Sequence, residues 1–489
     1  MKTMSKNNVT KISVALILLL ISFIFLAIFS VSTSPFFSYA ESPDSAMFQL
    51  IGKYWSLGNI PYISLWDQKG PLIFFIDAVG FYFLKSSLGV FCIQILFLWA
   101  DLYLIYKIFH KYGVAILSLS IIAFLISFGH LYGYGNTVEE YILPLLILGF
   151  YKQYQWMEGF YHGNISHSSK YASIYGFILA FALLTRLTNA LGVCAGFGFV
   201  LITLLCYGKW SEFWKNAGSA ILGFFILFLP FAAYFYYYDA FMDMWEGTFL
   251  FNVQYAKNSA NVIQQGFVNF PNPASCYFLI VISSLELLFS KYRKRGIFLL
   301  VISILPVLWI WNSNGYAHYS IICVPYLLLA ILEIIHIASN EDKKIVVWTF
   351  RGIGTIFLLL ILHLMIQRRS NNNFYYIDGT DRNKVFAELI DCIPDSERDA
   401  FVAYEIIPTV YLYNDIKPCY KYFFFQDWHC SYDSKLTQIM RGVFNSGKAH
   451  WILIKDGYNG PLKDIFSEKY TVYRQGKYKD IKYCLLHLK

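Results

Sequence analysis

The sequence is dominated by long apolar runs without charge, each about as long as a bilayer is thick. The first extends from Ile12 to Ala40, well beyond the roughly 7 to 15 apolar residues of a cleavable signal peptide. Ten more runs of roughly 16 to 22 residues follow, near 87–106, 113–131, 141–157, 171–185, 189–207, 216–235, 275–290, 297–311, 319–337 and 346–366. The sequence therefore predicts an all-α polytopic membrane bundle of about eleven transmembrane helices.

Charge is distributed unevenly along the chain. Of all residues, 57% are hydrophobic and 14% charged, against about 45 to 50% and about 25% in soluble domains. Residues 1–369 contain 39 charged residues, whereas the 120 residues of 370–489 contain 31. We therefore expect a transmembrane domain over 1–370 and a soluble domain over 371–489. The absence of a dense Lys/Arg stripe argues against nucleic acid as a partner.

The last quarter alternates strand-like and helix-like segments, which predicts a small α/β domain. Expected strands are Phe401–Tyr404, Lys421–Phe425, Trp451–Ile454, Tyr470–Arg474 and Tyr483–Leu488, and expected helices are Ile406–Tyr413 and Ser434–Val443. None of the nine cysteines forms a C-x-x-C or zinc spacing. Cys419 and Cys430 either pair in an oxidising compartment or remain free thiols.

Basic residues predict the orientation of the bundle. If the short apolar segment Gly70–Leu84 lies at the interface instead of spanning, the inner loops contain 16 basic residues and the outer side before the tail contains seven. We therefore expect a plasma membrane protein with interfacial helices in the first outer loop, a cytoplasmic N-terminus and an extracytoplasmic tail. Acidic residues then gather on the outer side: Glu41, Asp44, Asp67, Asp77, Glu139, Glu140, Asp239, Asp243 and Glu246.

Three outer charges are candidates for chemistry. Asp44 follows Pro43 at a predicted helix start, where the helix dipole keeps a carboxylate ionised and able to accept a proton; a simple capping role is the alternative. Lys69 re-enters the interface beside Asp67, so it either meets a phosphate or snorkels. Arg186 lies in a short hairpin close to lipid, where it needs a phosphate or a carboxylate as partner.

Other outer residues could complete a site. Glu139 and Glu140 start the fourth span, and adjacent helical residues do not share a face, so we expect only one of them to point into a site. The alternative is a helix capped by Asn136 or Thr137 with an acidic first turn, which explains one glutamate better than two. The aromatic loop near 236–274 suits either sugar rings or a membrane-interface belt. His318 is either a site residue or a satisfied interface group.

Six stretches of the predicted outer side stand out as motifs: Pro43–Phe48, Gly58–Tyr62, Trp66–Leu72, Asn136–Tyr141, Arg186–Asn189 and His318–Tyr319. The first three resemble the first extracytoplasmic loop of GT-C membrane glycosyltransferases, and the other three resemble further pieces of these enzymes. Among these enzymes, the chain is most similar to the bacterial branch related to protein O-mannosyltransferases and to the lipid A aminoarabinose transferase. The resemblance covers about residues 12–370.

The resemblance implies roles for these residues. Asp44 would be the catalytic base, Glu139 or Glu140 a second acidic site, and Lys69 and Arg186 the phosphate clamp; Glu41, Asp67, His318 and Tyr319 would line the substrate site. The chain departs from the related enzymes at Asp44-Ser45, where the mannosyltransferases have Asp-Glu, and at Lys69-Gly-Pro71, where the lipid A branch has Lys-Pro-Pro. No cofactor is required, although Asp44 and Glu140 could share a divalent metal ion.

The expected function is that of an inverting glycosyltransferase. It would move a sugar from a polyprenyl-phosphate donor to an envelope glycan, lipid or protein on the outer face of the membrane. A transporter or flippase of lipid-linked glycans and a non-catalytic envelope assembly protein are the alternatives. A transporter would place ionisable groups deep in its helices and repeat its halves, and no repeat is visible in the sequence.

Overall fold

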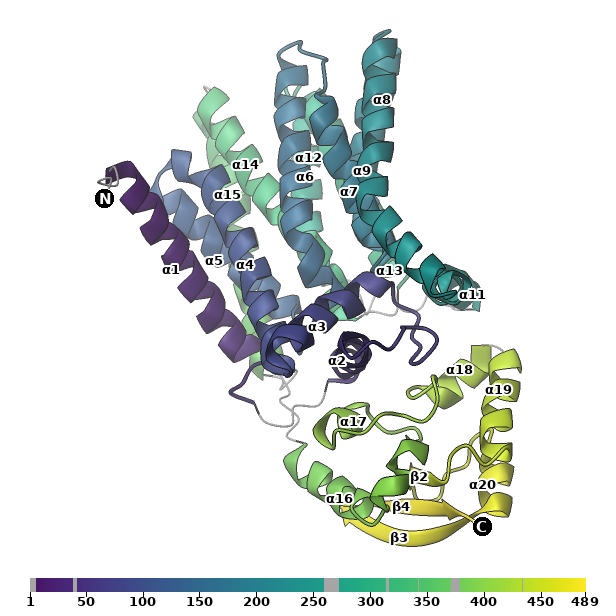
Figure 1. The fold of residues 1–489 in the computed structure, drawn as a ribbon. Coiled ribbons are helices and arrows are strands. Elements are labelled where there is room, and N and C mark those ends of the chain that lie inside the picture. Colours follow the sequence, from purple (N-terminus) through teal and green to yellow (C-terminus); the bar gives the residue numbers. More distant parts are fainter. Residues whose placement is uncertain are drawn as a thin grey trace, which may run out of the picture.

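The chain forms a helical bundle with a small mixed domain below one end (Figure 1). The computed structural model describes residues 6–37, 42–258, 272–313, 316–341, 343–370, 379–432 and 434–489. Each apolar run expected to span the membrane contains a helix among its described residues. The bundle helices are α1 Lys6–Phe29, α4 Ser87–Phe109, α5 Val114–Leu131, α6 Val138–Tyr161, α7 Ser169–Leu183, α8 Leu191–Cys206, α9 Trp210–Tyr237, α12 Ala274–Leu287, α13 Arg293–Trp311, α14 Val324–Asn340 and α15 Lys344–Ser370.

Length and composition make this a multi-pass membrane protein. Among the described residues, seven helical stretches are long and apolar enough to cross a bilayer. They are Ile12–Phe29, Ser87–Tyr112, Val114–Leu131, Leu187–Cys206, Trp210–Tyr237, Arg293–Trp311 and Ala317–Asn340.

The first long run does not stay helical over its whole length. Helix α1 ends at Phe29, and residues 31–37 form turns. Polar side chains explain the end: Ser34 Oγ donates to the Ala27 carbonyl, and Thr33 Oγ1 donates to Gln94 Oε1 at 2.5 Å. The expected anchor over 12–40 was therefore too long, because apolarity alone does not register hydroxyl groups that bond the backbone.

Two short helices, α2 Pro43–Ser56 and α3 Pro71–Leu84, lie across one end of the bundle (Figure 1). Each begins with a proline in its first turn, the position where the missing N–H is not needed. They pack closely because Gly52 faces the backbone of Asp77 and Ala78; a Cβ on Gly52 would meet Asp77 Cβ at 2.6 Å. This layer carries Asp44 at its first turn.

Shorter helices fill the connections between these elements. They are 3₁₀ helices η1 His110–Tyr112, η2 Leu187–Ala190, η5 Ala317–Cys323 and η6 Asp395–Ala400, the π-helix η3 Glu246–Leu250, and α-helices α10 Phe241–Trp245 and α11 Phe251–Asn258.

The C-terminal domain is a four-stranded mixed sheet with helices packed around it. The strand order is β1-β2-β4-β3, with β1 parallel to β2 and the other pairs antiparallel. The strands are β1 Phe401–Ala403, β2 Trp451–Lys455, β3 Tyr470–Tyr478 and β4 Ile481–Leu488, and the helices are α16 Thr380–Ile390, α17 Thr409–Tyr413, α18 Gln426–Tyr432, α19 Ser434–Asn445 and α20 Lys463–Lys469. Cys419 and Cys430 are free thiols.

One expected strand, Lys421–Phe425, is not a strand. Its β-prone residues instead form an irregular segment whose backbone binds the first outer loop: the Trp66 N–H donates to the Lys421 carbonyl at 2.9 Å. Ion pairs of Lys421 with Asp243 and of Lys53 with Asp415 also join the domain to the bundle. A partner distant in sequence therefore decided the conformation of this segment.

Candidate active site

Charged side chains from four separate segments influence one another electrostatically where the α2–α3 layer covers the bundle. Asp44 comes from the first turn of α2, Lys69 from the loop before α3, Arg186 from the turn after α7, and Glu139 from the first turn of α6. The charge of Asp44 acts on Arg186, and those of Glu139, Asp44 and Lys69 all act on His318 in η5. The residues singled out in the sequence therefore share one electrostatic neighbourhood.

Backbone hydrogen bonds bring the first loop to the Arg186 turn. The Gly70 N–H donates to the Thr185 carbonyl at 3.2 Å, and the Leu72 N–H donates to the Leu184 carbonyl at 3.0 Å. Only glycine fits at position 70, because a Cβ there would lie 2.2 Å from the Leu184 carbonyl oxygen. The loop bearing Lys69 is thereby fixed beside the turn that bears Arg186.

Arg186 has two partners in the site. Its Nη1 lies 2.5 Å from Glu139 Oε1, and its guanidinium carbon lies 3.9 Å from the centre of the Tyr319 ring. Burial opposes the charge, but Glu139, Tyr319 and Asp44 together raise the pKa of Arg186 above its ordinary value. The Arg186 side chain is 14% exposed. The N–H donors of its guanidinium form a fork that suits an anion with several oxygens.

Glu139 is fully buried and only half satisfied. Its Oε1 pairs with Arg186, whereas its Oε2 accepts no hydrogen bond from the described residues. Asn189, three residues after Arg186, is 2% exposed, and neither polar atom of its side-chain amide has a partner in the described chain. Buried polar atoms without protein partners point to water or a polar ligand.

Asp67 and Lys69 form a compact turn. The Lys69 N–H donates to Asp67 Oδ1 at 2.9 Å, and the Lys69 carbonyl accepts from the Tyr62 hydroxyl at 2.7 Å. Burial raises the pKa of Asp67, although the nearby Lys69 acts in the opposite direction. These bonds hold the backbone of Lys69, and the residue as a whole is half-buried.

Glu140 has a different set of partners from Glu139. Its carboxylate accepts from Gln94 Nε2 at 3.0 Å and from the Thr137 N–H at 2.7 Å, and it also bonds to the Tyr132 hydroxyl. Thr137 and Glu140 form a capping box at the start of α6. Protein donors thus occupy the Glu140 carboxylate, which the sequence suggested could share a divalent metal ion with Asp44.

A metal centre does not fit this donor set. Among the residues that the structure describes, no three His, Cys, Asp or Glu side chains gather in a way that could hold a metal ion. Glu41, expected to line the substrate site, lies outside the described residues. The same holds for 259–271 in the aromatic outer loop.

A buried network of hydrogen bonds joins the helices next to the site, and the sequence analysis did not predict it. Asn136 Nδ2 donates to Asp77 Oδ2 at 2.9 Å and to Ser45 Oγ at 3.1 Å, while Asn136 Oδ1 accepts from the Tyr141 hydroxyl. Asn136 is fully buried with φ of 55°. It thereby ties α2, at the residue next to Asp44, to α3 and α6. In the sequence, Asn136 directly follows Gly135, a pattern that reads equally well as a turn.

Solved structures resemble this chain in fold although its sequence matches no known family. No family model matches the chain, and no curated protein matches it. Among solved structures, it is similar to the crystal structure of ArnT from Cupriavidus metallidurans bound to undecaprenyl phosphate, with a TM-score of 0.49 and 9% sequence identity. The match covers 99% of this chain and 98% of that chain.

Proposed function

We propose that the protein is an inverting glycosyltransferase that takes its sugar from a polyprenyl-phosphate donor. The acceptor is an envelope glycan, lipid or protein on the outer face of the plasma membrane. The observation that carries the proposal is the cluster of Asp44, Lys69, Arg186 and Glu139 at the end of an apolar bundle. A lipid-linked sugar phosphate needs this combination: an apolar bundle for its chain, cations for its phosphate and a base for the acceptor.

The cations serve the leaving group. Arg186 and Lys69 lie on two segments that are hydrogen-bonded to each other through Gly70 and Thr185, so they can grip one phosphate from two sides. Arg186 would exchange its bond to Glu139 for the phosphate oxygens, since a guanidinium prefers a bidentate anion. Positive charge placed where negative charge develops stabilises the transition state.

Asp44 serves the nucleophile. It takes the proton from an acceptor hydroxyl while that oxygen bonds to the anomeric carbon, and the bond from this carbon to the phosphate oxygen breaks. The electron pair leaves with the polyprenyl phosphate. Because attack and departure occur on opposite faces in one step, the anomeric configuration inverts. Asp44 lies in the first turn of α2, at the N-terminus of that helix.

The test is a transfer assay with purified protein and a panel of polyprenyl-phosphate sugars, read as released polyprenyl phosphate. We expect release with at least one donor and its loss in Asp44→Asn. Asp239→Asn is the matched control, because Asp239 is exposed and lies outside the cluster. An active Asp44→Asn protein would remove the base from the proposal, and no release with any donor would contradict the proposed activity.

The clamp is tested separately by donor binding. We expect Lys69→Ala to weaken donor affinity by about tenfold, the effect of losing one charge-assisted hydrogen bond, without changing elution in size-exclusion chromatography. Lys85→Ala is the control, because Lys85 is an exposed lysine just after α3. Equal donor affinity in Lys69→Ala and wild type would contradict the clamp.

A further inference from the structure

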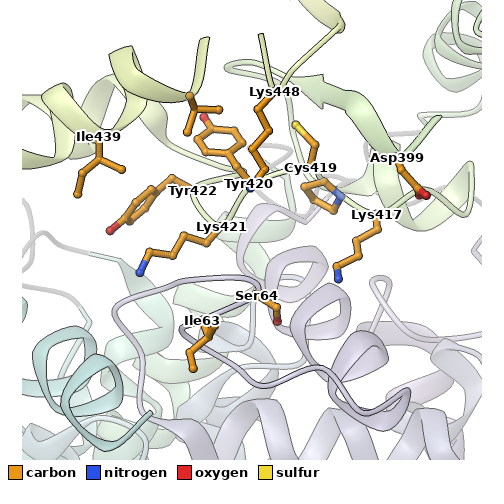
Figure 2. Close-up of a pocket in the computed structure, with 12 residues that line it drawn as sticks. Ile63, Ser64, Asp399, Lys417, Cys419, Tyr420, Lys421, Tyr422, Ile439 and Lys448 are labelled. Carbon is orange, nitrogen blue, oxygen red and sulfur yellow. The ribbon is translucent and has the colours of Figure 1, made fainter. Parts of the chain in front are cut away.

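A cavity lies outside the cluster, between the first outer loop and the C-terminal domain. It has a volume of about 560 Å³, which is in the usual range of roughly 300 to 1,000 Å³ for small-molecule sites. Figure 2 shows its lining, in which Ile63 and Ser64 of the loop face a stretch of the domain. The other lining residues are Asp399, Lys417, Pro418, Cys419, Tyr420, Lys421, Tyr422, Ile439, Val443 and Lys448.

The lining is positively charged. Lys417, Lys421 and Lys448 face a single acidic residue, Asp399. Lys417 donates to Asn59 Oδ1 at 2.5 Å, and Lys421 pairs with Asp243 at 3.2 Å, so these two lysines also fasten the domain to the bundle. Lys448 is exposed and has no hydrogen bond or ion pair with any described residue. One ammonium group at this cavity is therefore available to a ligand.

Apolar side chains lie between the lysines. Ile63 and Ile439 are 45% and 47% exposed and offer apolar surface at the cavity. An acyl chain needs a continuous apolar lining, and here the apolar surface is interrupted by lysines. A sugar bearing an acidic group suits this pattern better, because its C–H faces pack on apolar side chains while its charge meets lysine.

The cavity is joined directly to the proposed active site. The Lys421 carbonyl accepts from the Trp66 N–H, and the Tyr422 and Trp66 rings lie 5.4 Å apart. Trp66 immediately precedes Asp67, and Lys69 follows two residues later. The segment that lines the cavity is therefore bonded directly to the loop that carries Lys69. A ligand in the cavity would thus lie on the water side of the loop that holds the donor phosphate.

We infer that this cavity binds an anionic saccharide, the phosphate- or carboxylate-bearing sugar portion of the acceptor. The inference rests on the proposed function and names the acceptor class for it. Lys448 supplies the main charge contact, and Lys417 and Lys421 supply the surrounding positive field. The neighbouring isoleucines receive the sugar rings.

The experiment measures binding, which needs no turnover. The full-length protein in phosphatidylcholine nanodiscs is titrated by calorimetry with trigalacturonate, glucose 6-phosphate and the neutral trisaccharide maltotriose. We expect saturable binding of the acidic sugars only, weakening with added salt. Lys448→Gln should weaken this binding by about tenfold, and Lys448→Arg should restore it. Lys482→Gln, an exposed lysine on β4 outside the cavity, should bind like wild type.

Three results would overturn the inference. The first is that wild type binds no acidic sugar, and the second is that wild type and Lys448→Gln bind acidic sugars equally. The third is that the protein binds vesicles of the anionic lipid phosphatidylglycerol, offered as a separate probe, but none of the acidic sugars. Failure of the proposed function would look different: Lys448-dependent binding in a protein that transfers no sugar would leave an anionic-saccharide site without the transferase. Normal transfer with no Lys448-dependent binding would remove the cavity alone.

Discussion

Variants of the ion pair between Arg186 and Glu139 can separate the role of Arg186 in donor binding from its role in protein stability. Its atoms lie 2.5 Å apart, with Glu139 fully buried and the Arg186 side chain 14% exposed. At an effective dielectric constant of about 20, this distance corresponds to about 7 kcal/mol of Coulomb attraction. Desolvation of both charges offsets most of it. Removing one partner of such a pair costs about 3 to 5 kcal/mol, because it leaves an uncompensated buried charge.

We therefore predict opposite outcomes for stability and for donor binding in a double-mutant cycle. Arg186→Gln and Glu139→Gln should each destabilise the protein by about 3 kcal/mol, the lower end of the range because Arg186 is not fully buried. The double variant Arg186→Gln/Glu139→Gln leaves no unpaired charge, so its stability should return to within about 1 kcal/mol of wild type. Its donor affinity should stay at least about tenfold weaker, because the phosphate has lost the guanidinium.

The assay combines thermal unfolding midpoints in detergent with titration of a polyprenyl-phosphate sugar. Arg441→Gln is the control for stability, since Arg441 forms an exposed ion pair with Asp464 and should be nearly neutral. Normal donor affinity in the double variant would refute the clamp, because Arg186 would then serve only to neutralise Glu139. Unchanged stability in both single variants would refute the reasoning about the buried pair.

Three further predictions follow from the structure. Gly70→Ala should lower donor affinity and the unfolding midpoint, because its Cβ would lie 2.2 Å from the Leu184 carbonyl oxygen; wild-type values in both would contradict the fixed loop. Asn136→Ala should destabilise by about 3 kcal/mol through the buried carboxylate of Asp77 that it leaves unpartnered, measured as the unfolding midpoint, whereas an unchanged midpoint would show that the network is dispensable. Burial lowers the pKa of His429 to about 3 in the folded protein, whereas the same imidazole in the unfolded chain binds a proton near pH 6.5. As the pH falls from about 6.5 to 3, the free energy of unfolding should therefore fall by about 1.4 kcal/mol per pH unit. His429→Phe should flatten that slope in unfolding measured against pH, and an unaltered slope would assign the acid sensitivity to other groups.

The sequence by itself determined the helical membrane bundle and the mixed α/β character of the C-terminal domain. Runs of bilayer length such as Ser87–Phe109 admit only helices, since a backbone in lipid must satisfy its own hydrogen bonds. Local chemistry also located the start of α2, because proline fits the first helical turn. These features depend on residues that are close together along the chain.

Tertiary structure alone decided which polar groups meet. Glu139 and Glu140 are adjacent and chemically alike, yet one pairs with Arg186, 47 residues away, and the other caps its own helix. Asn136 reads as a turn residue in the sequence and is a buried junction of three helices in the structure. The segment Lys421–Phe425 has strand-like composition, but its backbone found a partner in the first outer loop. Such pairings depend on which groups the packed helices bring within about 3 Å, and no local pattern encodes that distance.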